Sequence, residues 1–492
     1  MNRILPVLII PLIISCSASR QYDPNKKFDR ETLQKDYTLL RNILENKHPS
    51  LYWYTPKDSM DFYFNRGYLA IADSMTELQF GWNVLAPLLS TIHCGHTSFN
   101  MSKEWNRFIK NRVIPSFPLR LNVWDDSMMV VQNLDENDSS IRRGDFVTAI
   151  NGLKNQEIIN TLFKSMVKDG YSENINYSRL SINFPYFHRN VFGLYQNYSV
   201  NFVDKNGILK NTVIPFYTPA EDSVKKVIKA EKVSKRRTSR TQRLSSLRNV
   251  KYDSTSALII INSFSKSHLR PFLRRTFREI RNNSIENVIL DLRFNGGGNI
   301  NNSVLLTKYI RNTPFKVADS AYSIEKNFAP YSSYISKTFF NNIGLFFVSR
   351  KKKDGNYHFG YWENHTFKPK HRNHFNGKVY VLVGGPTFSA STLFCNAVKG
   401  QENVILAGQE TGGGWYGNSG ILIPHITLPH TKVRIRLPFF RLVQFNHIEM
   451  KGTGVIPDIY IGTNSQDILN RIDTKVKVVT EMIKQSSSAG KE

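Results

Sequence analysis

The stretch VYVLVGGPTFSASTLF, residues 379–394, joins an apolar, β-branched run to a helix-like segment through a turn with two glycines and a proline. Such a run, set between helices, is typical of a strand in a sheet covered on both faces. Ser389 and Ser391 stand in the turn, where open α/β sheets place their ligands. On this turn alone, capping of the following helix by Thr387, Ser389 or Ser391 is the simpler interpretation. A serine nucleophile is the alternative.

Similar apolar runs occur on both sides of this strand. SALIIINSF (256–264) precedes a helical pattern, ENVILDLRF (286–294) leads to Asn295 and Gly296–Gly298, and NVILAG (403–408) leads to QETGGG. Strands that alternate with helices predict an α/β domain over residues 254–475. The triple glycine lacks both the spacing of a dinucleotide fingerprint and the Lys-Ser/Thr of a phosphate loop. It therefore predicts either an oxyanion hole or a tight structural turn.

The N-terminal half has a different pattern. The residues from Asp29 onward, DRETLQKDYTLLRNILENKHPSLY, space their apolar side chains as a helix does, and Pro49 stops the pattern. With two further helical stretches, this predicts a helical domain over residues 28–110. Short alternating runs with Asn- and Asp-rich turns predict a β-rich module over residues 111–218. Its RGDFVTAING resembles a recurring part of PDZ domains, which bind peptides along a sheet edge; a spacer without a ligand is the alternative.

The composition is globular but strongly basic. The chain has 492 residues, 40% hydrophobic and 12% aromatic, and its net charge is +27. This length suits two to four domains, and the aromatic content argues against general disorder. Residues 223–251 carry many Lys and Arg but a single acid, Glu231, and almost no aromatic side chains to stack on bases. We therefore predict no nucleic-acid site.

The ends of the chain and its connecting segment are interpreted from composition. Residues 219–253 are interpreted as a basic linker, with weak attraction to anionic lipid or polysaccharide as the alternative. Residues 476–492 are interpreted as a polar tail. The N-terminus, MNRILPVLIIPLIISC, has an apolar run too short to span a bilayer and the layout of a secretory signal.

The end of that signal predicts a lipid anchor. Ile13-Ile14-Ser15-Cys16 resembles a bacterial lipobox, which would make Cys16 the lipidated first residue, followed by a tether to residue 27. This implies a membrane-anchored lipoprotein of the cell envelope that faces the periplasm; a cleaved signal with an incidental cysteine is the alternative. Cys94 and Cys395 have no spacing typical of zinc, and no metal or other cofactor is predicted.

A serine nucleophile needs a base and usually an orienting acid. Among the twelve histidines, His93 and His96 stand together in IHCGHTSF, whereas His48 precedes a proline and is expected to be structural. Glu449, in NHIEMKGTGVIPDI, is the best-placed acid late in the chain. Spacing alone does not select these residues.

The order of motifs does carry a resemblance. HCGHTSF, RGDFVTAING, DLRFNGGG, VLVGGPTFSAS and AGQETGGG follow one another, and E-x-K-G-x-G-V-x-P-D stands near the end. In this order they resemble the C-terminal-processing (tail-specific) serine peptidases, in the branch similar to the tricorn core peptidase. The resemblance implies three parts: an N-terminal helical cap, a PDZ-like β-rich module and a crotonase-like α/β peptidase domain. It also implies a peptide or protein substrate.

The resemblance also assigns roles to residues. It implies Ser389 as nucleophile, His96 as base and Glu449 as orienting acid, with oxyanion donors at Ala390 and at Gly297 or Gly296. Ser391 is then left to cap the helix. The lysine of the Ser-Lys branch is replaced by glycine near Gly414, and the serine that precedes the histidine in the tricorn core is Gly95 here.

The implied function is endopeptidase cleavage of peptides or protein C-terminal segments through an acyl-enzyme on Ser389. A catalytically inactive relative that binds a peptide or apolar ligand is the alternative, motivated by Gly95 and the missing lysine. A basic surface-binding protein that acts through residues 223–251 is a third possibility.

Overall fold

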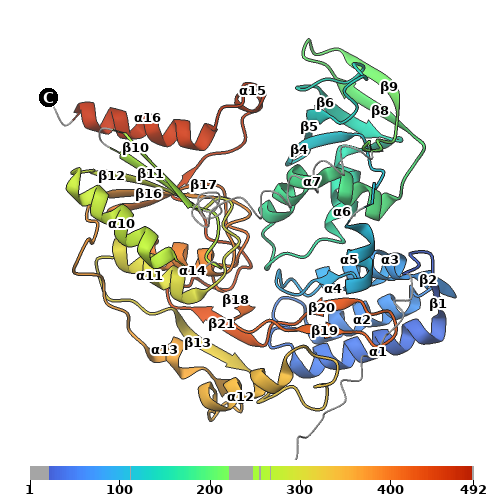
Figure 1. Ribbon diagram of the computed structural model, residues 1–492, viewed down its shortest axis with the longest axis horizontal. Coiled ribbons are helices and arrows are strands. Elements are labelled where there is room, and N and C mark those ends of the chain that lie inside the picture. Colours follow the sequence, from blue (N-terminus) through green and yellow to red (C-terminus); the bar gives the residue numbers. More distant parts are fainter. Residues whose placement is uncertain (1–21, 111, 221–247, 254–255, 266–267, 490–492) are drawn as a thin grey trace, which may run out of the picture.

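The computed structural model describes residues 22–110, 112–220, 248–253, 256–265 and 268–489 (Figure 1). Cys16 with the predicted signal, and most of the predicted basic linker, lie outside these residues. The architecture is mixed α/β and multidomain, as predicted. Within the described ranges, no helix has the length and apolarity needed to cross a membrane.

The N-terminal segment is mainly helical, as predicted. The Asp29 side chain caps its first long helix by accepting a hydrogen bond from the Thr32 N–H (2.8 Å), and that helix ends at Lys47, just ahead of Pro49. The elements are β1 (Lys27–Asp29), α1 (Arg30–Lys47), α2 (Lys57–Leu69), β2 (Ser74–Thr76), α3 (Glu77–Gln79), the π-helical η1 (Phe80–Leu85), α4 (Ala86–Ser90), β3 (Phe99–Asn100) and α5 (Lys103–Ile109).

The following segment is an antiparallel sheet with two helices. The strand order is β4-β5-β6-β8-β9, with β7 paired to β6. Helix α7 is not apparent in the sequence pattern, because Asn183 has a non-helical backbone and Pro185 interrupts the turn after it. The elements are β4 (Leu119–Trp124), β5 (Ser127–Asn133), β6 (Phe146–Ile150), β7 (Leu153–Lys154), α6 (Asn155–Phe163), α7 (Asn174–Phe192), β8 (Asn197–Val203) and β9 (Leu209–Pro215).

The C-terminal half contains a mostly parallel sheet in the order β10-β11-β12-β16-β17-β22, in which only β10 is antiparallel to its neighbour. Helices α10, α11 and α14 pack on one face and α16 on the other (Figure 1). The elements are β10 (Arg248–Tyr252), β11 (Ser256–Ile261), α10 (Leu269–Asn282), β12 (Asn287–Asp291), α11 (Ile300–Ile310), β16 (Lys378–Val383), α14 (Ala390–Val398), β17 (Val404–Gly408), β22 (Ile459–Tyr460), α15 (Ser465–Leu469) and α16 (Thr474–Ala489).

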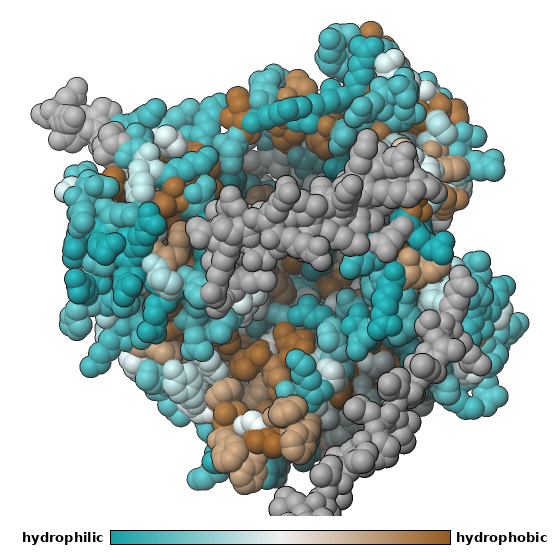
Figure 2. Space-filling model, in the orientation of Figure 1, coloured by the Kyte–Doolittle hydropathy of each residue, from teal (hydrophilic) through white to brown (hydrophobic). Residues whose placement is uncertain are grey.

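A second sheet, β14-β15-β13-β21-β18, lies beside the parallel one. Its segment includes α12, whose exposed side chains Phe339, Phe340, Phe346 and Phe347 form the apolar area at the lower edge of Figure 2. The elements are β13 (Ala318–Ser323), α12 (Thr338–Val348), β14 (Arg350–Lys351), β15 (Tyr357–His358), α13 (Gly360–Asn364), β18 (Gly417–Gly420) and β21 (Phe440–Gln444).

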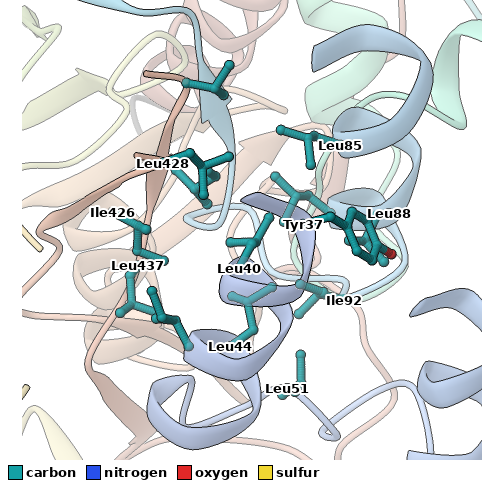
Figure 3. Close-up of a cluster of buried hydrophobic side chains, with 14 of the residues drawn as sticks. Tyr37, Leu40, Leu44, Leu51, Leu85, Leu88, Ile92, Ile426, Leu428 and Leu437 are labelled. Carbon is teal, nitrogen blue, oxygen red and sulfur yellow. The ribbon is translucent and has the colours of Figure 1, made fainter. Parts of the chain in front are cut away.

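The two ends of the chain share a hydrophobic core. Strands β19 (His425–Thr427) and β20 (Arg434–Arg436) form a small sheet with β3 of the N-terminal segment. Ile426, Leu428 and Leu437 pack against Tyr37, Leu40 and Leu44 of α1 (Figure 3). Because this core joins both segments, the loop between α4 and β3, which carries His96, is held against the C-terminal half of the chain.

Two predicted boundaries need correction. The end of the predicted linker is strand β10, which pairs with β11. Most of the predicted polar tail is helix α16, which buries Val479 and Ile483 against the parallel sheet. Its apolar residues are few because only one side of the helix faces the sheet.

Candidate active site

Ser389 occupies a strained position at the start of α14. Its backbone angles are φ 57° and ψ −122°, a region that L-residues with a side chain rarely adopt. The residue is partly exposed, and no side chain caps the helix. The Thr387 hydroxyl instead donates to the Leu292 carbonyl (2.9 Å). The capping interpretation of this turn is therefore wrong.

Ser391 does not take the role expected for it. It is a buried residue of the first turn of α14, and its Oγ has no hydrogen-bond partner among the described residues. Of the two serines in the turn, only Ser389 is open to solvent.

The triple-glycine turn lies directly against Ser389. A Cβ on Gly297, whose φ is +91°, would lie 2.7 Å from the Ser389 Cβ and 2.9 Å from the Ala390 nitrogen. Asn295 ties the turns together, because its carbonyl accepts from the Phe388 N–H (3.1 Å) and its side chain donates to the Ile261 carbonyl (2.9 Å). Two turns that are far apart in sequence thus meet at the carboxyl ends of β12 and β16.

The backbone N–H groups predicted as oxyanion donors differ in whether they are free to bind a ligand. The Gly297 N–H donates to the Asn295 Oδ1 (3.0 Å), so it is already engaged. Gly298, rather than Gly297 or Gly296, lines the cavity beside Ser389. Ala390 is the first residue of α14, where helix N–H groups have no partner within the helix.

A cavity of about 490 Å³ opens beside Ser389. Apolar side chains form most of its wall: Ile300, Phe359, Trp362, Leu393, Ile421, Ile423 and Leu442. Asn418 also lines it, and its Nδ2 is buried without a hydrogen-bond partner in the described part of the chain. A buried amide donor without a partner is costly unless a ligand accepts from it.

His96 packs against Phe388, the residue that precedes Ser389. Its ring is buried and packs on the Phe388 ring with 4.7 Å between centroids. Its Nδ1 is buried without a partner, and no hydrogen bond joins it to Ser389 among the described residues. Burial, with a smaller contribution from the charge of Arg436, lowers the pKa of His96 to about 3.

His48 supports the same loop and is structural, as expected. Its Nδ1 accepts from the Ser50 N–H (3.2 Å), so Nε2 carries the proton that it donates to the Thr97 hydroxyl (2.7 Å). Burial lowers the pKa of His48 to about 3, which keeps the ring neutral. His93 instead contacts the Gly170 carbonyl through Nδ1 (2.9 Å) and faces Tyr171.

No hydrogen bond or ion pair joins Glu449 to His96 within the described residues, so its role as orienting acid stays a prediction. The Glu449 side chain is 81% exposed and pairs with the Lys451 ammonium (3.5 Å). It belongs to a surface segment after β21, in which Phe445, Asn446 and His447 are also exposed.

Asp169 is the carboxylate that contacts the loop of His96, and sequence reasoning missed it. Its Oδ1 accepts from the Gly95 N–H (2.6 Å). Burial raises the pKa of Asp169 to about 7, although the N–H groups of Gly95 and Gly414 and the charge of Arg179 oppose the shift. The Asp-Gly pair at residues 169–170 resembles an ordinary turn, so no pattern distinguishes it.

Gly95 is glycine because a side chain does not fit. A Cβ there would lie 2.7 Å from the Phe388 ring and 3.1 Å from Asp169 Oδ1. We expect Gly95→Ser to lower the free energy of unfolding by roughly 1–3 kcal/mol, because the buried Phe388 and His96 rings must shift. Urea denaturation measures this. Gly344→Ser, in open space on α12, is the control and should not lower the midpoint. An unchanged midpoint for Gly95→Ser would contradict the prediction.

The motifs QETGGG (409–414) and EMKGTGVIPD (449–458) stabilise one another. The Glu410 side chain accepts a hydrogen bond from the Gly454 N–H (2.6 Å), and Gly414 forms an isolated antiparallel β-bridge with Gly454. A Cβ on Gly454 would lie 1.8 Å from the Thr411 carbonyl oxygen, so only glycine fits.

Cys94 and Cys395 are both buried and not bonded to each other.

Comparison with known proteins agrees with this geometry. Residues 255–461 match the model of peptidase family S41, so this part of the chain is an S41 peptidase domain and the chain is a serine-type peptidase. No curated protein matches the sequence.

Solved structures share the fold at low sequence identity. The structure of mature CPAF complexed with lactacystin is 13% identical with a TM-score of 0.64, and covers 93% of this chain and 98% of that chain. A second structure of mature CPAF is 12% identical with a TM-score of 0.61, and covers 89% of this chain and 94% of that chain. The tricorn protease is 13% identical, covers 93% of this chain and 37% of that chain, and has a TM-score of 0.41.

Proposed function

We propose that the chain cleaves peptides or protein C-terminal segments by acyl transfer to Ser389. The observation that carries the proposal is the strained, partly exposed Ser389, set against the triple-glycine turn and beside a cavity. A nucleophile in such a turn has its Oγ clear of the sheet, and the amino end of α14 favours negative charge beside it.

In the proposed mechanism His96 is the base. It takes the proton of Ser389 during attack and returns it to the leaving amine. Water then hydrolyses the acyl-enzyme, with His96 again taking the proton, and Ser389 is freed. A pKa of about 3 makes His96 a weak base, because general bases work best with a pKa near the working pH. Substrate binding therefore has to move the Phe388 ring and bring His96 to Ser389. A carboxylate that then reached Nδ1 would raise the pKa of His96.

The proposed oxyanion donors are the N–H groups of Ala390 and Gly298. Ala390 lies at the helix start, and Gly298 lines the cavity while the Gly297 N–H is engaged with Asn295. Each donor of this kind lowers the barrier by about 2.7–4 kcal/mol.

The cavity is the proposed subsite for an apolar substrate side chain next to the scissile bond. Its volume of about 490 Å³ and its walls of Phe359, Trp362 and Ile421 suit a large aliphatic or aromatic group. The unpartnered Nδ2 of Asn418 is proposed to donate to a main-chain carbonyl of the substrate.

The cellular setting is also proposed. Ile13-Ile14-Ser15-Cys16 supports a lipid anchor at Cys16 and a location in the bacterial cell envelope facing the periplasm. The order of the sequence motifs supports assignment to the tail-specific peptidases and peptide binding by the β4–β9 sheet, as in PDZ domains.

The alternative function, an inactive binder of peptides, is favoured by one observation: no hydrogen bond joins His96 and Ser389 within the described residues.

A fluorophosphonate probe tests the proposal against that alternative, because it reacts with activated serines. We expect mass spectrometry of the labelled full chain to find the adduct on Ser389. Ser391→Ala should label as well as wild type, since Ser391 is buried. A chain that stays unlabelled while a serine peptidase in the same reaction is labelled would support the inactive binder.

A further inference from the structure

A second and larger cavity, of about 890 Å³, lies between the N-terminal helical segment and the β-rich module. Five arginines line it: Arg120, Arg179, Arg189, Arg434 and Arg436. We call it the arginine cavity. Glu136 is the one acidic residue among the lining side chains that the structure describes. The cavity does not include Ser389.

The arginines face the cavity because of regular secondary structure. In β20, the buried Ile435 points into the core shared by both ends of the chain, so its neighbours Arg434 and Arg436 point to the opposite face. Arg179 and Arg189 come from α7, and Arg120 comes from β4. Three separate elements thus direct positive charge into one space.

These charges lack ion-pair partners among the described residues, although the charge of Asp169 acts on Arg179 at longer range. None of the five guanidinium groups forms an ion pair with a carboxylate in the part of the chain that the structure describes. Arg179 donates to the Asn176 Oδ1 (3.0 Å) and Arg434 to the Met101 carbonyl (3.3 Å), and both acceptors are neutral. The side chains of Arg120, Arg189 and Arg436 have no hydrogen-bond partner among the described residues.

Burial makes the missing partners costly. Desolvation lowers the pKa of Arg179 to about 10 and also lowers the pKa values of Arg189 and Arg436. The charge of Arg436 further lowers the pKa of His96, His425 and Arg179, so its field reaches three neighbouring groups. Charged groups withdrawn from water need a counter-charge, and a protein usually supplies one within the fold.

Aromatic side chains form another part of the wall. Trp82, Phe99, Trp105, Tyr186 and Phe187 all line the cavity. Its volume falls in the range of sites that enclose small molecules. We propose that the arginine cavity binds a small anion, a carboxylate or phosphate, that carries an apolar or aromatic group.

The cavity also reaches the catalytic loop. Gly95, next to His96, belongs to its lining. An anion seated on Arg436 would offset the charge that weakens His96 as a base, so binding should favour cleavage. This consequence rests on the proposed function, whereas the binding itself does not.

Calorimetric titration of the full chain tests the binding. The probes are 1-naphthoate and 1-naphthyl phosphate, with neutral 1-naphthol as the matched uncharged probe. We expect one or both anions to bind at least about tenfold more tightly than naphthol, which corresponds to about 1.4 kcal/mol. The stronger of the two identifies the preferred anion. Equal affinities of all three probes would overturn the proposal and leave only an apolar pocket.

Substitutions locate the site. Arg436→Gln and the exposed Arg120→Gln should each weaken anion binding, Arg436→Gln by about tenfold, and neither should change naphthol binding. Arg278→Gln, on α10 outside the cavity, removes the same charge and should have no effect. Phe340→Ser on α12 controls for binding at that exposed apolar surface. Equal losses in Arg278→Gln, or none in either cavity variant, would overturn the proposal. Repeating the titration with Ser389→Ala separates binding from catalysis.

Discussion

Replacing Ser389 by alanine is expected to reduce peptide cleavage by roughly 10⁴- to 10⁶-fold, because the acyl-enzyme can no longer form. The fold should persist, since the Ser389 side chain takes part in no capping bond. Ser389→Gly should be equally inactive yet more stable by about 1 kcal/mol, because glycine adopts φ 57° without strain. Cleavage of an unstructured protein with an apolar C-terminus, together with urea denaturation, measures both effects.

The neighbouring serine gives the matched control for this prediction. Ser391→Ala removes a hydroxyl of the same turn that has no partner among the described residues, so activity should stay within about twofold of wild type. If Ser389→Ala cleaves as fast as wild type, another group is the nucleophile. If Ser391→Ala is the inactive variant, the roles of the two serines are reversed.

Replacing His96 by phenylalanine is expected to lower the rate of cleavage by at least about 10⁴-fold. The substitution keeps a ring against Phe388, so it separates the loss of a base from the loss of packing. No hydrogen bond of Nδ1 is lost, because that atom has no partner in the described residues. The folded state should therefore be about as stable as wild type, which the urea midpoint reports.

A second buried histidine is the control for His96→Phe. His188, in α7, is also buried, also has an unpartnered Nδ1 within the described residues, and packs on Phe117 and Phe184. Burial lowers its pKa to about 4, so it resembles His96 in environment but lies in the β-rich module. His188→Phe should keep full activity. Equal losses from both substitutions would mean that His96 acts through packing rather than as a base.

Part of the site could be predicted because it follows from strand order. Ser389 and Gly297 stand after β16 and β12, which are parallel neighbours, so their turns must meet at one sheet edge. The helical start at Asp29 and the α/β pattern after residue 254 could also be read from periodicity. These features depend on residues close together in the sequence, or on regular pairing.

The rest depends on contacts between distant segments. Asp169 meets Gly95 only because the β-rich module packs against the loop after α4. Asn418 comes to line the cavity beside Ser389 only through the second sheet. Glu449 was assigned through family resemblance, which does not reveal that its loop lies on the surface. The alternation in Arg434-Ile435-Arg436 was present in the sequence, but it indicated neither a cavity nor the arginines of α7.

The backbone of Ser389 bears on the choice between a working peptidase and a silent relative. Its φ and ψ angles lie where a Cβ costs on the order of 1–3 kcal/mol and where glycine costs almost nothing. A chain that only held peptides would lose nothing by mutating to glycine at this position, and would fold more firmly. Serine at this position strains the backbone, and the proposed cleavage accounts for a protein that keeps it.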